Sequence, residues 1–323
     1  MYDLFKNSKE KDDFYARELV PLFFTRLNNE DSENKARDER FPYLNGGLFD
    51  DTQDRKYNNL FLPLDIFERM FETFNNYNFT IYEDAPDEHT VAIDPEMLGH
   101  IFENLLEDNK DKGAFYTPKE IVHYMCKESL KVYLFAHDET HFENNELAKL
   151  TIDKIIQQQD LNSEEKQYAE KYAFKIIDAL EQVKICDPAI GSGAFPMGLL
   201  QEIFNAQIYL QELKGFKKGV SDADIKKHII EESIYGVDID AGAVDIARLR
   251  FWLSLVVDEQ EPKPLPNLDF KIICANTLIP LGKVNELDMN AKASLAVKEL
   301  EKIRHDFFKI GRASCRERVY VLV

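Results

Sequence analysis

The stretch ICDPAIGSGAF, residues 185–195, combines an acidic side chain with two closely spaced glycines. It lies between a short apolar segment and an expected helix over 195–213. A strand-to-helix turn needs one glycine at most, so a second glycine near Asp187 indicates that a ligand approaches the backbone closely. Gly191 and Gly193 allow a sharp turn, and the first N–H groups of the following helix would point at that ligand.

Two further polar side chains follow expected strands. Asp238 ends a strand expected over 233–238, and Asn276 ends another over 270–276. Strands that alternate with helices predict a parallel sheet covered on both faces. Ligands of such sheets bind outside the carboxyl ends of the strands. We therefore expect Asp187, Asp238 and Asn276 to share one site.

The residue types at this site indicate the chemistry of the ligand. Asp187 suits a cationic amine, Asp238 suits ribose hydroxyls, and the side-chain carbonyl of Asn276 suits the amine of an adenine. A dinucleotide site would need a third glycine where Pro196 stands, and an acidic residue about 20 positions on. Here Asp238 lies 51 positions after Asp187, and no basic residue flanks the glycines. S-adenosylmethionine has an ammonium, a ribose diol and an adenine but no phosphate, so it is the predicted cofactor.

Composition limits the remaining classes of function. The 323 residues are 44% hydrophobic and 31% charged, with a net charge of −19. A free-standing nucleic-acid binder is usually basic, so this chain is not expected to bind nucleic acid by itself. The four cysteines form no CxxC pair and the histidines lack ligand spacing, which predicts reduced cytosolic thiols and no metal site. No apolar run is long enough to span a membrane, so we expect a cytoplasmic protein without a membrane partner.

The segments before the glycine turn are mostly helical. Thr117 is a good N-cap, Pro118 suits the first helical position and Glu120 completes a capping box, which predicts a helix over 118–136. Residues 141–182 read as a polar helical insertion. Residues 1–93 mix helical and irregular segments. Further elements are expected as a strand at 77–84, a strand at 183–186, and helices at 222–232 and 240–259, the last capped by Asp240.

Four motifs together resemble the gamma-type N6-adenine-specific DNA methyltransferases of type IIG restriction-modification enzymes. They are GAFYTPKEIV, DPAIGSGAF, IYGVDID and ICANTLI, in the order that this family uses. The upstream strings FPYLNGGLF and DPEMLGHIFENLL are also similar to these enzymes. The resemblance covers roughly residues 35–309. It implies a Rossmann-like α/β methyltransferase core over 94–309, preceded by a mainly helical N-terminal region.

The resemblance also implies roles for single residues. Tyr116 and Thr117 would contact the methionine carboxylate, although the capping box alone also accounts for Thr117. Asp187, Gly191 and Gly193 would line the methionine, Asp238 the ribose and Asn276 the adenine. The implied reaction transfers a methyl group from S-adenosylmethionine to adenine N6 in double-stranded DNA, within a restriction-modification or phage-defence system.

The catalytic string of that family, Asn/Asp-Pro-Pro-Tyr/Phe, does not occur in this sequence. No catalytic residue is therefore assigned, and we expect the chain to hold the cofactor site while lacking the catalytic motif. A helix is expected over 285–308. Residues 310–323, with IGRASCRERV, resemble a translated sequencing adapter and are expected to be an artefact, so contact with DNA would depend on missing regions.

Two alternative functions stay open. A protein methyltransferase that acts on glutamine side chains shares the cofactor core, although the long N-terminal part and the GAFYTP string count against it. A non-catalytic cofactor-binding module is permitted by the missing motif. The sequence does not decide the DNA target, a fused nuclease or the oligomeric state.

Overall fold

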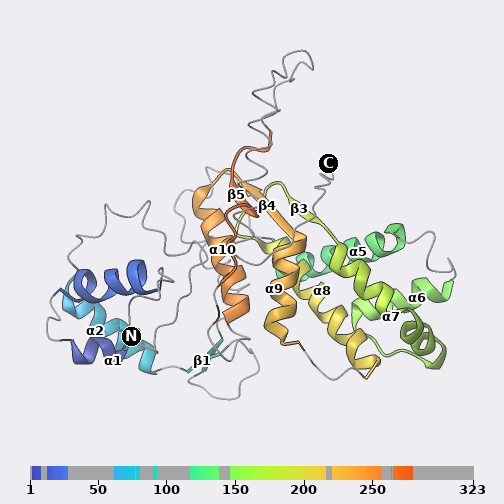
Figure 1. Cartoon of the computed structure of the whole chain (residues 1–323), viewed down its shortest axis with the longest axis horizontal. Helices are drawn as coiled ribbons and strands as arrows, with labels where there is room; N and C mark the ends of the chain where they lie inside the picture. The colour runs from blue at the N-terminus through green and yellow to red at the C-terminus, as the bar shows by residue number, and fades with distance from the viewer. Residues whose placement is uncertain are drawn as a thin grey trace, which may run out of the picture.

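The computed structural model describes residues 2–8, 13–27, 62–76, 78–80, 90–92, 117–137, 146–215, 220–256, 263 and 265–278. Tyr116, the expected helix over 285–308 and the tail over 310–323 lie outside the described residues. The described part is mostly helical, with a small parallel sheet (Figure 1). Its buried apolar side chains form two clusters, a small one near the N-terminus and a large one around the sheet.

The small cluster is aromatic and belongs to the N-terminal helices. It joins α1 (Tyr2–Asn7), two π-helical turns, η2 (Tyr15–Leu19) and η3 (Leu22–Arg26), and α2 (Leu64–Asn76). The ring centroids of Phe5 and Phe14 lie 5.0 Å apart at 83°, an edge-to-face arrangement that aromatic pairs favour. Phe67 and Phe71 pack on the same two rings from α2. This region therefore has a core of its own.

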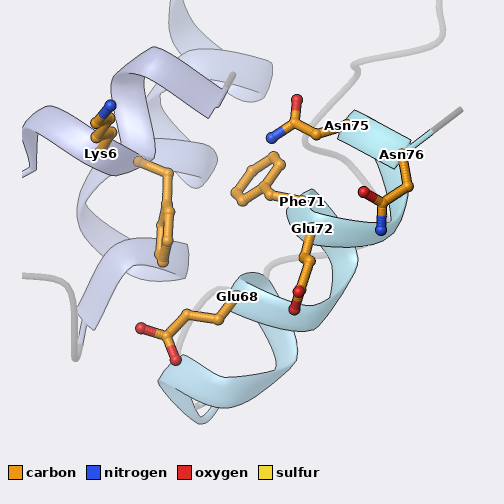
Figure 2. Close-up of a pocket in the computed structure, with 7 residues that line it drawn as sticks. Lys6, Glu68, Phe71, Glu72, Asn75 and Asn76 are labelled. Carbon is orange, nitrogen blue, oxygen red and sulfur yellow. The ribbon is translucent and has the colours of Figure 1, made fainter. Parts of the chain in front are cut away.

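A cavity of about 400 Å³ opens between α1 and α2 (Figure 2). Phe5 and Phe71 contribute apolar surface to it, and the polar lining residues are Lys6, Glu68, Glu72, Asn75 and Asn76. All five of these polar residues are exposed. The cavity contains none of the residues that the sequence assigns to the cofactor site.

Two short parallel strands follow, β1 (Asn78–Thr80) and β2 (Thr90–Ala92). The described part of the strand expected over 77–84 is β1, and residues 77 and 81–84 lie outside the described residues.

The main sheet has three parallel strands in the order β3 (Ile185–Asp187), β4 (Ile234–Asp238) and β5 (Ile272–Cys274). Ile234 and Ile272 are both 1% exposed and belong to the large cluster, and Ile185 packs against it. On the other face Cys186 is exposed and Ile273 is 37% exposed. Among the described residues, the large apolar cluster therefore lies against one face of the sheet, and cover on the second face stays a prediction.

Three helices connect these strands, α8 (Ala194–Leu213), α9 (Asp222–Ser233) and α10 (Ala241–Val256) (Figure 1). Ser221 caps α9, since its side chain accepts a hydrogen bond from the Asp224 N–H at 3.1 Å. Asp240 caps α10 in the same way, with its Oδ1 accepting from the Ala243 N–H at 3.1 Å. The cap predicted for Asp240 is confirmed, and the three helices begin within one residue of their predicted starts.

Helices α5 (Lys119–His137), α6 (Glu146–Gln157) and α7 (Ser163–Gln182) pack beside α8 (Figure 1). The side chain of Asn162 caps α7 and forms a capping box with Glu165. Ile152 and Ile176 are 1% exposed, so the segment read as a polar insertion contributes apolar side chains to the main core. The helix predicted over 118–136 is confirmed, shifted by one residue. None of the described helices has the length and apolarity needed to cross a bilayer.

Candidate functional site at the carboxyl edge of the sheet

The ends of the three strands lie at one edge of the sheet. In the register of the sheet, Asp187 pairs with Gly236 and Asp238 pairs with Cys274. The Ala275 N–H donates to the backbone carbonyl of Asp238 at 2.8 Å, which extends the pairing beyond β5. The structure thus brings together the loops that the sequence analysis assigned to one site.

The glycine turn folds back onto β4. The Ile190 N–H donates to the Val237 carbonyl at 2.9 Å, and the Gly193 N–H donates to the Ile190 carbonyl at 2.8 Å. Ile190 is 3% exposed and packs on Gly236, where an added Cβ would lie 2.2 Å from its Cδ1 atom. Gly236 is therefore a strand position where the turn approaches the backbone too closely for a side chain.

The two glycines of the turn have different environments. Gly191 has φ +53° and Gly193 has φ +86°, and both values favour glycine. A Cβ on Gly193 would lie 3.3 Å from the Cβ of Ala247 in α10, so helix packing accounts for this glycine. A Cβ on Gly191 would meet nothing within 4 Å. Of the two glycines predicted to approach a ligand, Gly191 is the one that borders open space.

The carboxylate of Asp238 joins the turn to the end of β4. Its Oδ2 accepts a hydrogen bond from the Gly191 N–H at 2.8 Å, and its Oδ1 accepts one from the Asp240 N–H at 2.9 Å. Each carboxylate oxygen has a second lone pair, so the group retains capacity for hydroxyl donors. Asp238 is only partly buried and can be reached by a ligand.

Asp187 occupies the equivalent position at the end of β3. Its Oδ1 accepts from the Ala189 N–H at 3.1 Å. Burial raises the pKa of Asp187 and the nearby Asp238 charge adds to the rise, while the hydrogen bond from Ala189 opposes both. A cationic group beside these two carboxylates would relieve the repulsion between them, so the pair favours a ligand with an ammonium group.

Asn276 and Thr277 complete the edge after β5. The Thr277 hydroxyl donates to the Pro188 carbonyl at 3.1 Å, which ties this loop to the glycine turn. The side-chain oxygen of Asn276 accepts from the Leu278 N–H at 2.9 Å, and its side chain is exposed. A second lone pair on that oxygen stays open to an amine donor.

Helix α5 contacts the start of α8 through residues in its middle. Gly198 of α8 lies against α5 so closely that an added Cβ would be 2.8 Å from Val122. The Cys126 thiol lies 3.5 Å from the Phe195 carbonyl at the start of α8. Cys126 of α5 thus lies beside the first turn of α8. The roles expected for Thr117 and for Tyr116, which lies outside the described residues, stay predictions.

One residue of this region was missed by the sequence analysis. Arg250 of α10 is 2% exposed, and its Nη1 donates to the Ser192 carbonyl at 2.6 Å and to the Ser192 Oγ at 3.2 Å. Its position one turn after the buried Ala247 was the available signal. Within the described ranges, no group of three or more His, Cys, Asp or Glu side chains is arranged to hold a metal ion.

The chain is similar to proteins of one class, the restriction-modification enzymes. It is 31% identical over 306 residues to a protein of Methanocaldococcus jannaschii named as a type II restriction enzyme and methyltransferase. The match covers 86% of this chain and 25% of that relative, so the chain spans about a quarter of the relative's length. No protein-family model matches the chain.

A solved structure shares the fold. The type IIL restriction-modification enzyme MmeI, determined in complex with DNA, aligns with a TM-score of 0.52 and 17% sequence identity. The alignment covers 85% of this chain and 33% of the MmeI chain. The fold of this chain is therefore one that a restriction-modification enzyme also contains.

Proposed function

We propose that this chain forms the cofactor-binding part of an S-adenosylmethionine-dependent DNA methyltransferase of a restriction-modification system. The proposal is supported by the positions of Asp187 and Asp238 at the ends of neighbouring parallel strands, with Asn276 after the third strand. It is also supported by the hydrogen bond from Gly191, which borders open space, to Asp238. We further propose that residues 94–309 form a Rossmann-like methyltransferase core. The methyl group that the cofactor carries on its sulfonium is the electrophile of such a reaction.

Each side chain has a defined part in this proposal. Asp187 accepts hydrogen bonds from the ammonium of the cofactor, and the N–H groups at the start of α8 face its methionine end. Asp238 accepts from the ribose hydroxyls with the lone pairs that Gly191 and Asp240 leave open. Asn276 accepts from the adenine amine. These contacts bind and orient the cofactor, and none of them takes part in the methyl transfer itself.

The target base is proposed to be adenine, with transfer to its N6 atom in double-stranded DNA. This rests on the resemblance of the four motifs and on the similarity to restriction-modification enzymes. The sequence contains no Asn-Pro-Pro-Tyr string and has a net charge of −19. We therefore assign cofactor binding to this chain, and DNA contact and base chemistry to a protein that also contains that string and a basic surface.

Isothermal titration calorimetry tests the proposal. The chain is expected to bind one equivalent of either S-adenosylmethionine or its demethylated product. It is not expected to bind NAD⁺, whose pyrophosphate would be repelled by the carboxylates of Asp187 and Asp238 beside the glycine turn. Asp238→Ala should weaken binding, whereas Asp245→Ala, which removes an exposed carboxylate of α10, should not. The proposal is contradicted if the folded chain binds neither S-adenosylmethionine nor its demethylated product, or if it binds NAD⁺ more tightly than either.

A further inference from the structure

A buried guanidinium lies directly behind the glycine turn. Arg250 and Ser192 are 2% and 3% exposed, so their hydrogen bonds form away from water. The Nη1 atom of Arg250 donates to the backbone carbonyl of Ser192 at 2.6 Å and to its hydroxyl at 3.2 Å. Ser192 is the central residue between the two glycines. The guanidinium therefore holds the peptide unit on which the direction of the turn depends.

Burying a charged group costs free energy, so its placement needs a compensating interaction. A hydrogen bond from a charged donor is about twice as strong as one between neutral groups. Here that strength is applied to a turn whose glycines adopt left-handed conformations and have little stiffness of their own. The buried charge thus restricts a flexible element rather than filling the core.

Helix α10 supports the turn at a second point, one helical turn earlier. Ala247 lies beneath Gly193, where a Cβ would come within 3.3 Å. Ala247 and Arg250 therefore contact two successive residues of the turn from its buried side. On the opposite side, Gly191 borders open space and its N–H donates to Asp238.

We propose that Arg250 is a positioning residue for the cofactor turn, and this inference rests on the proposed function. By fixing the Ser192 carbonyl, Arg250 keeps the Gly191 N–H on Asp238 and keeps the open side of Gly191 aligned with the end of β4. In this proposal Arg250 acts through its hydrogen bonds to Ser192 and not through the ligand. It stabilises the turn in its ligand-ready conformation before the cofactor binds.

The experiment compares the full chain with Arg250→Met, Arg250→Lys and a control, Trp252→Phe. Trp252 is also buried in α10 and donates from its Nε1 to a backbone carbonyl, that of Pro266, at 2.9 Å. The control thus loses a similar hydrogen bond from the same helix at a point away from the turn. Three quantities are measured: unfolding in urea, amide hydrogen exchange of a peptide spanning 188–193, and the dissociation constant of S-adenosylmethionine.

Arg250→Met is expected to speed exchange of the Ile190, Gly191 and Gly193 amides and to weaken cofactor binding, each by about tenfold, as expected for the loss of a charged hydrogen bond. Arg250→Lys keeps one charged donor. Its amide exchange rates and its dissociation constant are therefore expected to rise by at most about threefold over those of the wild type. Trp252→Phe is expected to lower the stability without changing either local quantity. If Arg250→Met does not fold, Arg250→Lys is compared with Trp252→Phe instead. Arg250→Lys should then show faster amide exchange within 188–193 and weaker cofactor binding, and Trp252→Phe should show neither.

Two results overturn the inference. One is wild-type exchange and affinity in both Arg250 variants, and the other is an equal loss in Trp252→Phe, which would mark Arg250 as a general stabilising residue. If the wild-type chain does not bind S-adenosylmethionine, the proposed function fails. The exchange comparison then still decides whether Arg250 holds the turn.

Discussion

The N–H of Gly191 donates a hydrogen bond to the Oδ2 atom of Asp238 at 2.8 Å, across 47 positions of sequence. This bond joins the turn after β3 to the end of β4. The other carboxylate oxygen accepts from the Asp240 N–H at 2.9 Å, at the start of α10. One side chain therefore has a structural role between two loops and a proposed role in binding the ribose.

Asp238→Ala tests both roles at once. It leaves two backbone donors without their acceptor, which is expected to lower the free energy of unfolding by about 1–3 kcal/mol. Cofactor affinity is expected to fall by more than tenfold, because both the ribose acceptor and the geometry of the turn are lost. Urea unfolding and calorimetry measure the two effects. Unchanged affinity in a folded variant would remove Asp238 from the site.

The glycines of the turn are expected to respond differently to alanine. Both substitutions strain a left-handed residue, at about 1–2 kcal/mol. Gly193→Ala also forces a methyl group toward Ala247, so it should lose more stability than Gly191→Ala. Gly191→Ala places its methyl group in open space, so it should lose cofactor binding with the smaller loss of stability. If Gly191→Ala lowered the free energy of unfolding more than Gly193→Ala, Gly193 would not be packed against Ala247 as described.

The contact between Gly236 and Ile190 is tested by a double-mutant cycle. Gly236→Ala puts a Cβ 2.2 Å from the Ile190 Cδ1, and overpacking of this kind costs about 1–3 kcal/mol. An Ile190→Ala background removes the Cδ1 and Cγ1 contacts and leaves only the Cβ of residue 190, 3.1 Å away, so the same substitution should cost much less there. Urea unfolding of the four proteins gives the coupling free energy. A coupling near zero would show that the turn does not lie on β4.

Asp187 gives a pH dependence with a defined sign. Burial raises the pKa of this carboxyl, so the folded protein keeps its proton to higher pH than the unfolded chain does. The folded state then binds more protons between the ordinary and the raised pKa, and its stability falls as pH increases through that window. Asp187→Asn should remove this fall, and it should also weaken cofactor binding. Urea unfolding at a series of pH values checks the sign, and a wild-type stability that rises in the window would contradict it.

Binding of a cationic ligand at Asp187 should also release protons. An ammonium nearby favours the ionised carboxylate and lowers its pKa, so protons leave in the same pH window. Calorimetry in buffers with different ionisation enthalpies measures this release, which Asp187→Asn should abolish.

Sequence periodicity located most elements of the main core. Helix α8 begins at Ala194 beside its predicted start at residue 195, because the apolar spacing that indicates a helix is a local property. The carboxyl edge was also predictable, since Asp187 and Asp238 each end a strand and parallel strands end on the same side. For these features the information lies within a few residues of each position.

Other features depend on contacts between distant segments. Gly193 looked like a ligand-contacting glycine, but its contact with Ala247 exists only after α10 packs on the turn. The segment over 141–182 looked polar because half of each helix faces water, yet Ile152 and Ile176 are buried against α8 and its neighbours. The local signature of Arg250, its spacing of one helical turn from Ala247, was overlooked because a charged residue in a helix is usually exposed.

A crystal structure of the chain grown with S-adenosylmethionine tests the central claim most directly. The account predicts the cofactor at the carboxyl edge of β3, β4 and β5, with its ammonium at Asp187, its ribose at Asp238 and its adenine at Asn276. A cofactor bound elsewhere, such as in the cavity between α1 and α2 beside Lys6 and Glu72, would contradict it.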